Sequence, residues 1–151
     1  MNQTFTRRTF VTSGLGAALA TGLPGRAAAA EPTAQERANV QVVNDFCAAF
    51  SGQNLATITS FLADDGVYRM TETAEPVKGR EAIAARLSGI VGRISHFDVL
   101  DTFARGPMVV NERVDHFTSG QMRAWHGVGV FFLKDGKIVE WLDYTISTER
   151  G

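Results

Sequence analysis

The sequence predicts an α+β fold in which a cone-shaped, curved, mixed or antiparallel β-sheet packs on N-terminal helices. Apolar residues recur at helical spacing up to residue 91, whereas from residue 94 onward they alternate with a period of two. Glycine-containing turns divide this second half into segments of strand length. Because the helices precede the strands in the chain, an antiparallel meander wrapped over helices is the expected architecture.

The first 30 residues resemble an export signal. Adjacent arginines at Arg7 and Arg8 precede a weakly apolar stretch rich in Gly and Ala, and residues 27–30 offer an Ala-x-Ala cleavage site. The stretch is shorter than the ~20 apolar residues that a spanning helix needs. We therefore expect a twin-arginine signal peptide over residues 1–30 and a periplasmic or secreted mature domain over 31–151, without stable membrane insertion. An ordinary secretory leader or an uncleaved anchor is the alternative.

Composition and charge exclude some classes of partner and site for the predicted domain. Of the 15 basic residues, 12 lie beyond residue 30, together with all 16 acidic ones, so the domain is mildly acidic. We therefore expect no nucleic-acid partner, because binding to nucleic acid depends on basic side chains. The single cysteine, Cys47, excludes an internal disulfide and a cysteine-based metal cage within one chain. Its place on the apolar face of the first predicted helix indicates a core residue.

Three helices are expected before the meander. Thr33 and Glu36 have the spacing of a capping box, and Gly52 suits the end of the helix that they begin. Asn54 is placed to cap a short second helix. A third helix is expected from about Arg80 to Val91, where apolar residues recur at helical spacing.

The remaining segments are read as strands and turns. Residues 64–66 (Asp-Asp-Gly) predict a turn, residues 67–71 a short strand and residues 72–79 a polar loop. Ser119-Gly120 and Asp135-Gly136 are expected to be two-residue turns between the last strands. The four long strands are expected at about 94–104, 108–118, 122–133 and 137–147.

Strand pairing predicts which side chains share a face of this sheet. With two-residue turns, Asn111 is expected opposite Val128, and Val128 opposite Asp143. The shared face would then carry Val109, Arg113, Asp115, Phe117, His126, Val128, Val130, Val139, Trp141 and Asp143. Charges among large apolar side chains either pair with one another or serve a pocket. A guanidinium between two carboxyl groups would separate their pKa values and yield one acid and one base, although a purely structural ion pair is the alternative.

Two motifs carry a family resemblance. Asn111-Glu112-Arg113-Val114-Asp115 and Trp141-Leu142-Asp143-Tyr144, with Gly129-Val130-Phe131 and Asp135-Gly136-Lys137-Ile138 between them, resemble the limonene-1,2-epoxide hydrolases. That family lies within the NTF2-like and SnoaL-like superfamily, and the similarity extends over roughly residues 40–145.

The resemblance implies a reaction and a set of roles. The reaction is a one-step hydrolysis of an epoxide, without a metal or other cofactor. Asp143 would be the general base that activates water, Asp115 the general acid, and Arg113 the bridge between them. Tyr68 would help to position the water. Where the family has an asparagine two residues after this tyrosine, the chain has Met70.

The expected pocket takes an apolar small molecule. Its walls are expected to include Met70, Phe117, His126 and Trp141. His126 is expected to face Arg113, and Thr71 or His126 could replace the missing asparagine at the water. A cyclase or isomerase of the same fold, and a non-catalytic binder of an apolar ligand, are the alternatives.

Two further expectations concern metals and partners. The chain has 3 histidines, His96, His116 and His126, without the His-x-His or His-x-x-x-His spacing of metal ligands, so no metal site is expected. The opposite face of the sheet is also expected to be apolar, through Trp125, Phe131, Leu133, Ile138, Leu142, Tyr144 and Ile146. Such a face predicts a homodimer formed by packing of the sheets, unless the leader or the C-terminus covers it.

Overall fold

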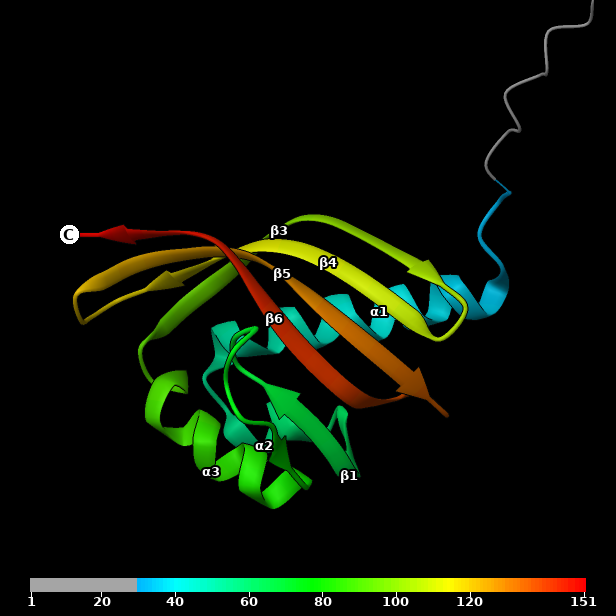
Figure 1. Cartoon of the computed structure of the whole chain (residues 1–151), viewed down its shortest axis with the longest axis horizontal. Coiled ribbons are helices and arrows are strands. Elements are labelled where there is room, and N and C mark those ends of the chain that lie inside the picture. The colour runs from blue at the N-terminus through cyan, green and yellow to red at the C-terminus, as the bar shows by residue number, and fades with distance from the viewer. Residues whose placement is uncertain (1–29) are drawn as a thin grey trace, which may run out of the picture. The chain divides into compact units, whose positions relative to one another are not determined.

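The computed structural model describes residues 30–151, so the predicted signal peptide lies outside it apart from Ala30. The α+β prediction is confirmed (Figure 1). In chain order the elements are α1 (Ala34–Ala49), the 3-10 turn η1 (Phe50–Gly52), α2 (Leu55–Thr59), β1 (Leu62–Arg69), β2 (Val77–Lys78), α3 (Arg80–Val91), β3 (Ile94–Arg105), β4 (Met108–Phe117), β5 (Met122–Lys134) and β6 (Lys137–Arg150). Among these elements no helix is long and apolar enough to cross a membrane.

The helices begin where the sequence predicts. The Thr33 hydroxyl accepts a hydrogen bond from the Glu36 backbone N–H at 3.1 Å, and the Glu36 carboxylate accepts one from the Thr33 N–H at 2.7 Å. This pair is the predicted capping box. Asn54 caps α2 by accepting from the Thr57 N–H at 3.0 Å. α3 follows Gly79, whose φ of 89° lies in the region that favours glycine.

The sheet has six strands in the order β2-β1-β6-β5-β4-β3. It is mixed, because β1 runs parallel to β6 while the other neighbours are antiparallel. The predicted turn at residues 64–66 is wrong. These residues lie inside β1 between Leu62 and Val67, which both pair with β6, and the register of β1 against β6 shifts between these two pairs. The predicted polar loop also contains a short strand, because Val77 and Lys78 pair with β1.

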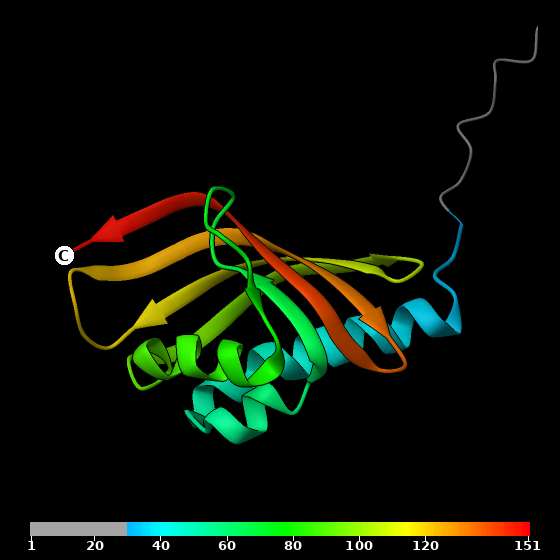
Figure 2. The same ribbon diagram turned by 60° about the horizontal axis from the view of Figure 1, so that its bottom comes forward.

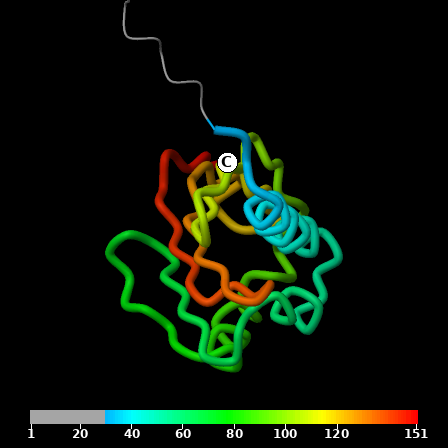
Figure 3. The backbone as a smooth tube through the Cα atoms, turned by 90° about the vertical axis from the view of Figure 1, so that its right-hand side faces the viewer, coloured from blue at the N-terminus to red at the C-terminus, as the bar shows by residue number. Residues whose placement is uncertain are grey.

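The three helices lie on one face of the sheet, here called the inner face. The four long strands arch over α1 (Figure 1), and the helices lie together beneath the sheet (Figure 2). Phe46 of α1 packs edge-on against Trp141 of β6 and Phe131 of β5, with ring centroids 5.0 and 5.9 Å apart. Seen from the end in Figure 3, the coil of α1 runs alongside the strands. The inner face and these helices enclose the hydrophobic core, in which Cys47 is fully buried as predicted.

The predicted register of β5 is wrong by one residue. Residues 118–121 connect β4 to β5, so Ser119-Gly120 is not a two-residue turn, and Asn111 pairs with Gly129. The Asp135-Gly136 turn is confirmed, but a bulge at Val139 then shifts the pairing with β6. As a consequence Val128, Val130 and His126 lie on the outer face. Conversely, the inner face receives the large side chains Trp125, Phe131, Leu133 and Ile138 that were expected outside.

The outer face carries a row of apolar side chains. Phe103, Val110, Val130 and Leu142 are directly paired across four neighbouring strands. Phe103 is 54% exposed. The homodimer expected from an apolar outer face stays a prediction.

Candidate active site

Arg113 joins the two carboxyl groups expected to work together. Its Nε donates to Asp115 Oδ1 and its Nη2 donates to Asp143 Oδ1, each at 2.9 Å. Arg113 and Asp115 are two residues apart on β4 and therefore share the inner face. Asp143 on β6 reaches the same place because β5, which separates the two strands, presents Gly127 and Gly129 there. The structure thus brings Arg113, Asp115 and Asp143 into one buried cluster.

Aromatic rings and a glycine make room for the buried guanidinium. Arg113 is 1% exposed, and its Cζ lies 5.1 Å from the ring centres of Phe97 and Trp125 and 5.9 Å from that of Trp141. Its Nη1 has no hydrogen-bond partner among the described residues. A Cβ at Gly129 would lie 2.5 Å from this nitrogen, so only glycine fits there without displacement. The ring faces interact favourably with the cation where a polar partner is missing.

Asp143 is the more strongly hydrogen-bonded of the two carboxyl groups. Besides Arg113, Trp141 Nε1 donates to its Oδ1 at 2.8 Å and the Tyr68 hydroxyl donates to its Oδ2 at 3.2 Å. The Tyr68 ring stacks on Trp141 with centroids 3.8 Å apart, which holds both donors in place. Burial raises the pKa of Tyr68, and the charge of Asp143 raises it further, so the hydroxyl stays protonated.

The surroundings decide which carboxyl group carries a proton. Burial raises the pKa of Asp115 to about 7, although Arg113 opposes the shift. Burial also raises the pKa of Asp143, but Arg113, Trp141 and Tyr68 all oppose this shift through hydrogen bonds. Because hydrogen bonds to a carboxylate favour its charged form, we assign the ionised state to Asp143 and the proton to Asp115. The cluster then holds one cation, one anion and one neutral acid.

A cavity of about 650 Å³ opens beside these carboxyl groups. Tyr68, Asp115 and Asp143 line it together with further polar residues, while apolar side chains form much of the wall. The lining residues are Tyr68, Met70, Thr71, Ile90, Arg93, Asp115, Phe117, Ser119, Gln121, Met122, Trp125, Asp143, Thr145, Thr148 and Arg150. The size and lining suit an apolar small molecule with one polar reacting group.

The position that holds asparagine in the resembling family contributes no strong donor here. Met70 lines the cavity, and its sulfur accepts a weak hydrogen bond from Arg86 at 3.2 Å. Thr71, beside it, also lines the cavity and carries a hydroxyl. Of the hydroxyl groups that line the cavity, that of Tyr68 contacts Asp143 directly, and those of Thr71 and Thr145 are further candidates to hold a water.

Two residues predicted for the pocket lie elsewhere. The prediction that His126 faces Arg113 is wrong, because the shifted register places it on the outer face, where its Nε2 lies 2.8 Å from Glu112 Oε1. Trp141 is 2% exposed and supports Tyr68 and Asp143 from behind without lining the cavity. Phe117 and Met70 do line it.

Sequence reasoning missed Trp125 and the two glycines of β5. Trp125 lies over Arg113, lines the cavity and donates from Nε1 to the Thr145 hydroxyl at 3.0 Å. A Cβ at Gly127 would lie 2.1 Å from the Trp125 ring, just as one at Gly129 would meet Arg113. The Gly-x-Gly spacing within a strand was the available signal, because alternate glycines leave one face open to a large side chain.

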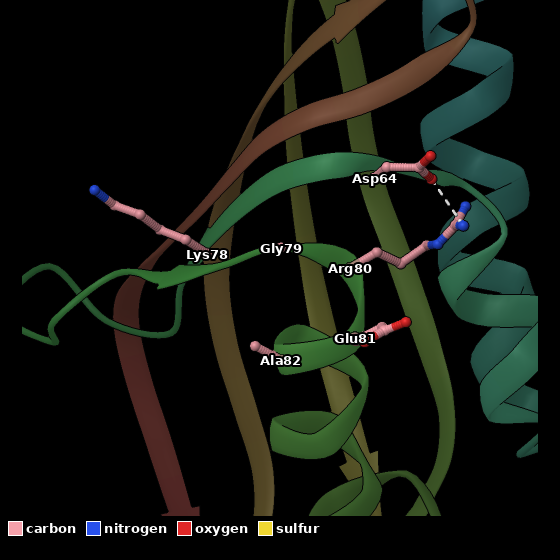
Figure 4. A pocket seen from close by; sticks show the side chains of 6 residues that line it. All are labelled: Asp64, Lys78, Gly79, Arg80, Glu81 and Ala82. Atoms are coloured by element: carbon pink, nitrogen blue, oxygen red, sulfur yellow. Dashed lines mark ion pairs between the residues drawn. The ribbon is translucent and has the colours of Figure 1, made fainter.

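A second hollow, where β1, β2 and α3 meet, offers no comparable chemistry. Figure 4 shows Arg80 extending toward Asp64, while Lys78 extends away from them. The Arg80–Asp64 ion pair is 2.7 Å long, but the two side chains are 42% and 87% exposed, so water screens it. The cavity beside Asp115 and Asp143 is therefore the candidate active site.

Comparisons with known proteins agree with the fold and identify the family. The family model of the SnoaL-like domain matches residues 43–141. The epoxide hydrolase EphG of Mycobacterium tuberculosis is 31% identical over 104 residues, which cover 68% of this chain and 69% of that protein. An LEH-like epoxide hydrolase structure from M. tuberculosis superposes with a TM-score of 0.65 at 27% identity, over 74% of this chain and 84% of the other.

A further structure supports the fold alone. A protein designated a SnoaL-like polyketide cyclase, from Jannaschia sp. CCS1, superposes with a TM-score of 0.68 at 18% identity. The match covers 78% of this chain and 91% of the other. The chain therefore belongs to the SnoaL-like family, in which it is similar to epoxide hydrolases of the limonene-epoxide-hydrolase-like type.

Proposed function

We propose that this protein is an epoxide hydrolase that adds water to an apolar cyclic or terpenoid epoxide. One observation carries the proposal: Arg113 bridges Asp115 and Asp143 at 2.9 Å each, and both carboxyl residues line a largely apolar cavity. This arrangement supplies a base and an acid within reach of one substrate. The reaction needs no cofactor, because both proton transfers are made by carboxyl groups.

The proposed reaction has one step. The Asp143 carboxylate takes a proton from a water molecule as the water oxygen bonds to an epoxide carbon. The bond between that carbon and the epoxide oxygen breaks, and Asp115 gives its proton to this oxygen. The product is a diol, and a proton must return from Asp143 to Asp115 before the next turnover. Relief of ring strain favours opening, while the fixed positions of acid, base and water lower the barrier.

Each group of the cluster has a separate task. Arg113 holds one oxygen of each carboxyl group, which leaves Asp143 Oδ2 and Asp115 Oδ2 for the substrate side. Tyr68 donates to Asp143 Oδ2 and thus lies next to the place where the water must bind. Thr71 supplies the second hydroxyl in place of the asparagine that Met70 replaces. Ile90, Phe117, Met122 and Trp125 would contact the apolar part of the epoxide.

A cyclase or isomerase is the second candidate function, and Met70 favours it. A reaction that only moves a proton on the substrate needs a carboxylate and an acid but no bound water. Without a strong water ligand at residue 70, the Asp143 carboxylate would instead take a proton from carbon. Hydrolysis in ¹⁸O-labelled water puts the label into the product, whereas isomerisation does not.

The test is turnover of the full chain on a panel of cyclic and terpenoid epoxides, with Asp143→Asn in parallel. The amide keeps the shape of the carboxyl group but is a poor base, so kcat should fall by about 10²–10⁴-fold. Asp101→Asn, which changes an exposed carboxylate on β3, is the matched control and should keep full activity. If the folded parent opens no epoxide, or if Asp143→Asn is as active as the parent, the hydrolase proposal fails.

A further inference from the structure

Three potential metal ligands meet on the outer face, away from the candidate active site. His96 on β3 is paired directly with His116 on β4, and their rings stack with centroids 4.5 Å apart and an interplanar angle of 11°. Asp98 follows two residues after His96 on the same face of β3. Its Oδ2 lies 2.8 Å from His116 Nε2 and its Oδ1 lies 3.4 Å from His96 Nε2. One ligand atom from each residue lies within 4.8 Å of the other two.

A β-bulge in β3 brings these three side chains onto the same face of the sheet. Ile94 pairs with Phe117 on the inner face, whereas His96 pairs with His116 on the outer face, so Ser95 is the extra residue of β3. Without the extra residue, His96 would share the face of Ile94, which is 1% exposed. The ligands come from two strands, which is why histidine spacing along one strand predicted no metal site.

We propose that His96, Asp98 and His116 form a binding site for a divalent transition metal of the zinc class. Two imidazole nitrogens and one carboxylate oxygen are three of the four ligands of a tetrahedral zinc ion, and water can supply the fourth. In such a site the ligand atoms lie about 3.3 Å apart. The side chains of His96, Asp98 and His116 are 45%, 56% and 36% exposed. They therefore have room to rotate closer around an ion, and the ion can enter from solvent.

The orientation of His96 supports a role as ligand. Its Nδ1 lies 2.9 Å from the Ser95 hydroxyl. A histidine that binds a metal through Nε2 commonly donates its other ring N–H to an oxygen, which fixes the ring. Ser95 is placed to accept this hydrogen bond. The Asp98 carboxylate also suits a divalent cation. Its negative charge offsets part of the charge of the ion, which two neutral imidazoles would not do.

An ion at this site would join the first residues of β3 to the last residues of β4. Phe117, next to His116, turns inward to line the substrate cavity, and the Thr118 N–H donates to the Arg93 carbonyl at 2.8 Å. The bound metal would therefore fix the strand ends that carry one wall of the cavity. It takes no part in the proposed epoxide chemistry, which uses the inner face.

The test is isothermal titration of the untagged, full-length chain with Zn²⁺ after treatment with a chelator. One ion per chain is expected to bind, and His116→Gln should weaken binding at least about tenfold, since loss of even an outer ligand contact costs that much. His126→Gln is the matched control. It removes an imidazole that is also on the outer face and also beside a carboxylate, Glu112, but outside the proposed site.

Two further measurements locate the ion. Co²⁺ in the parent should give the visible absorption of a tetrahedral or five-coordinate site, and His116→Gln should lose it. Asp143→Asn should leave the Zn²⁺ affinity unchanged, because binding at the active-site carboxylates would respond to that change. The proposal is overturned if the parent fails to bind Zn²⁺, if His116→Gln binds as tightly as the parent, or if His126→Gln or Asp143→Asn weakens binding equally.

Discussion

The guanidinium of Arg113 is the cation that two buried carboxyl groups share. Arg113→Met keeps much of the volume but removes the charge, which leaves an ionised carboxyl group buried without a partner. We expect the free energy of unfolding to fall by about 3–5 kcal/mol at about pH 8. At about pH 5 the loss should be smaller, because the carboxyl groups, whose pKa values burial raises, are then protonated in the variant.

Urea denaturation at both pH values measures this difference. Arg93→Met is the control, since Arg93 is an exposed arginine at the rim of the same cavity, and it should change stability by less than about 0.5 kcal/mol. An equal loss at both pH values in Arg113→Met would mean that packing alone is responsible.

The proton on Asp115 gives the proposed reaction an alkaline limit. Since burial raises the pKa of Asp115 to about 7, the acid is progressively lost as the pH rises above that value. We expect kcat/KM for the best epoxide to fall roughly tenfold for each pH unit above about 7. Initial rates from about pH 5 to about pH 9 measure this. A profile that stays flat to the alkaline end would remove Asp115 from the role of acid.

At the scale of the strand, β5 makes room for the cluster because its glycines have no side chains. Gly129→Ala would place a Cβ 2.5 Å from Arg113 Nη1 and 2.6 Å from the Phe131 ring, both in the packed interior. We expect a loss of about 1–3 kcal/mol in unfolding free energy, together with lower turnover as Arg113 is displaced. Gly89→Ala in α3 is the control. Nothing lies within 4 Å of a Cβ there, and alanine favours the helix, so thermal unfolding should show an unchanged or higher midpoint.

The strands also show why the site could be predicted while parts of its wall could not. The longer connection at residues 118–121 and the bulge at Val139 each shift the register of β5 by one residue in the same direction. Asn111 on β4 therefore still aligns with Asp143 on β6, as predicted, although through Gly129 rather than Val128. The two shifts cancel in the alignment of β4 with β6. They exchange the inner and outer faces of β5, which lies between these two strands. The faces of β5 residues such as His126 and Trp125, and of Ile138 before the bulge in β6, were therefore predicted wrongly.

For the whole molecule, the periodicity of the sequence was sufficient to predict the fold class. Helical and strand periods are local signals, and the caps at Thr33 and Asn54 are read from neighbouring residues. The parallel pairing of β1 with β6, by contrast, joins segments about half the chain apart. Residues 64–66 lie between Leu62 and Val67, at the irregularity where β1 changes its register against β6. No local pattern contains that information.

The same buried cluster should make the stability of the whole domain depend on pH. Folding raises the pKa of Asp115 from 3.8 to about 7, so the folded state holds this proton more tightly than the unfolded chain does. The stabilisation is complete below about pH 4 and is lost as the pH rises through about 7. We expect the free energy of unfolding of the parent to decline across this window by on the order of 1–4 kcal/mol more than that of Asp115→Asn, which has no proton to lose at this position. Urea midpoints of the two proteins at matched pH values measure the difference. Parallel curves would mean that Asp115 is ionised in the folded protein throughout, with Arg113 outweighing the effect of burial.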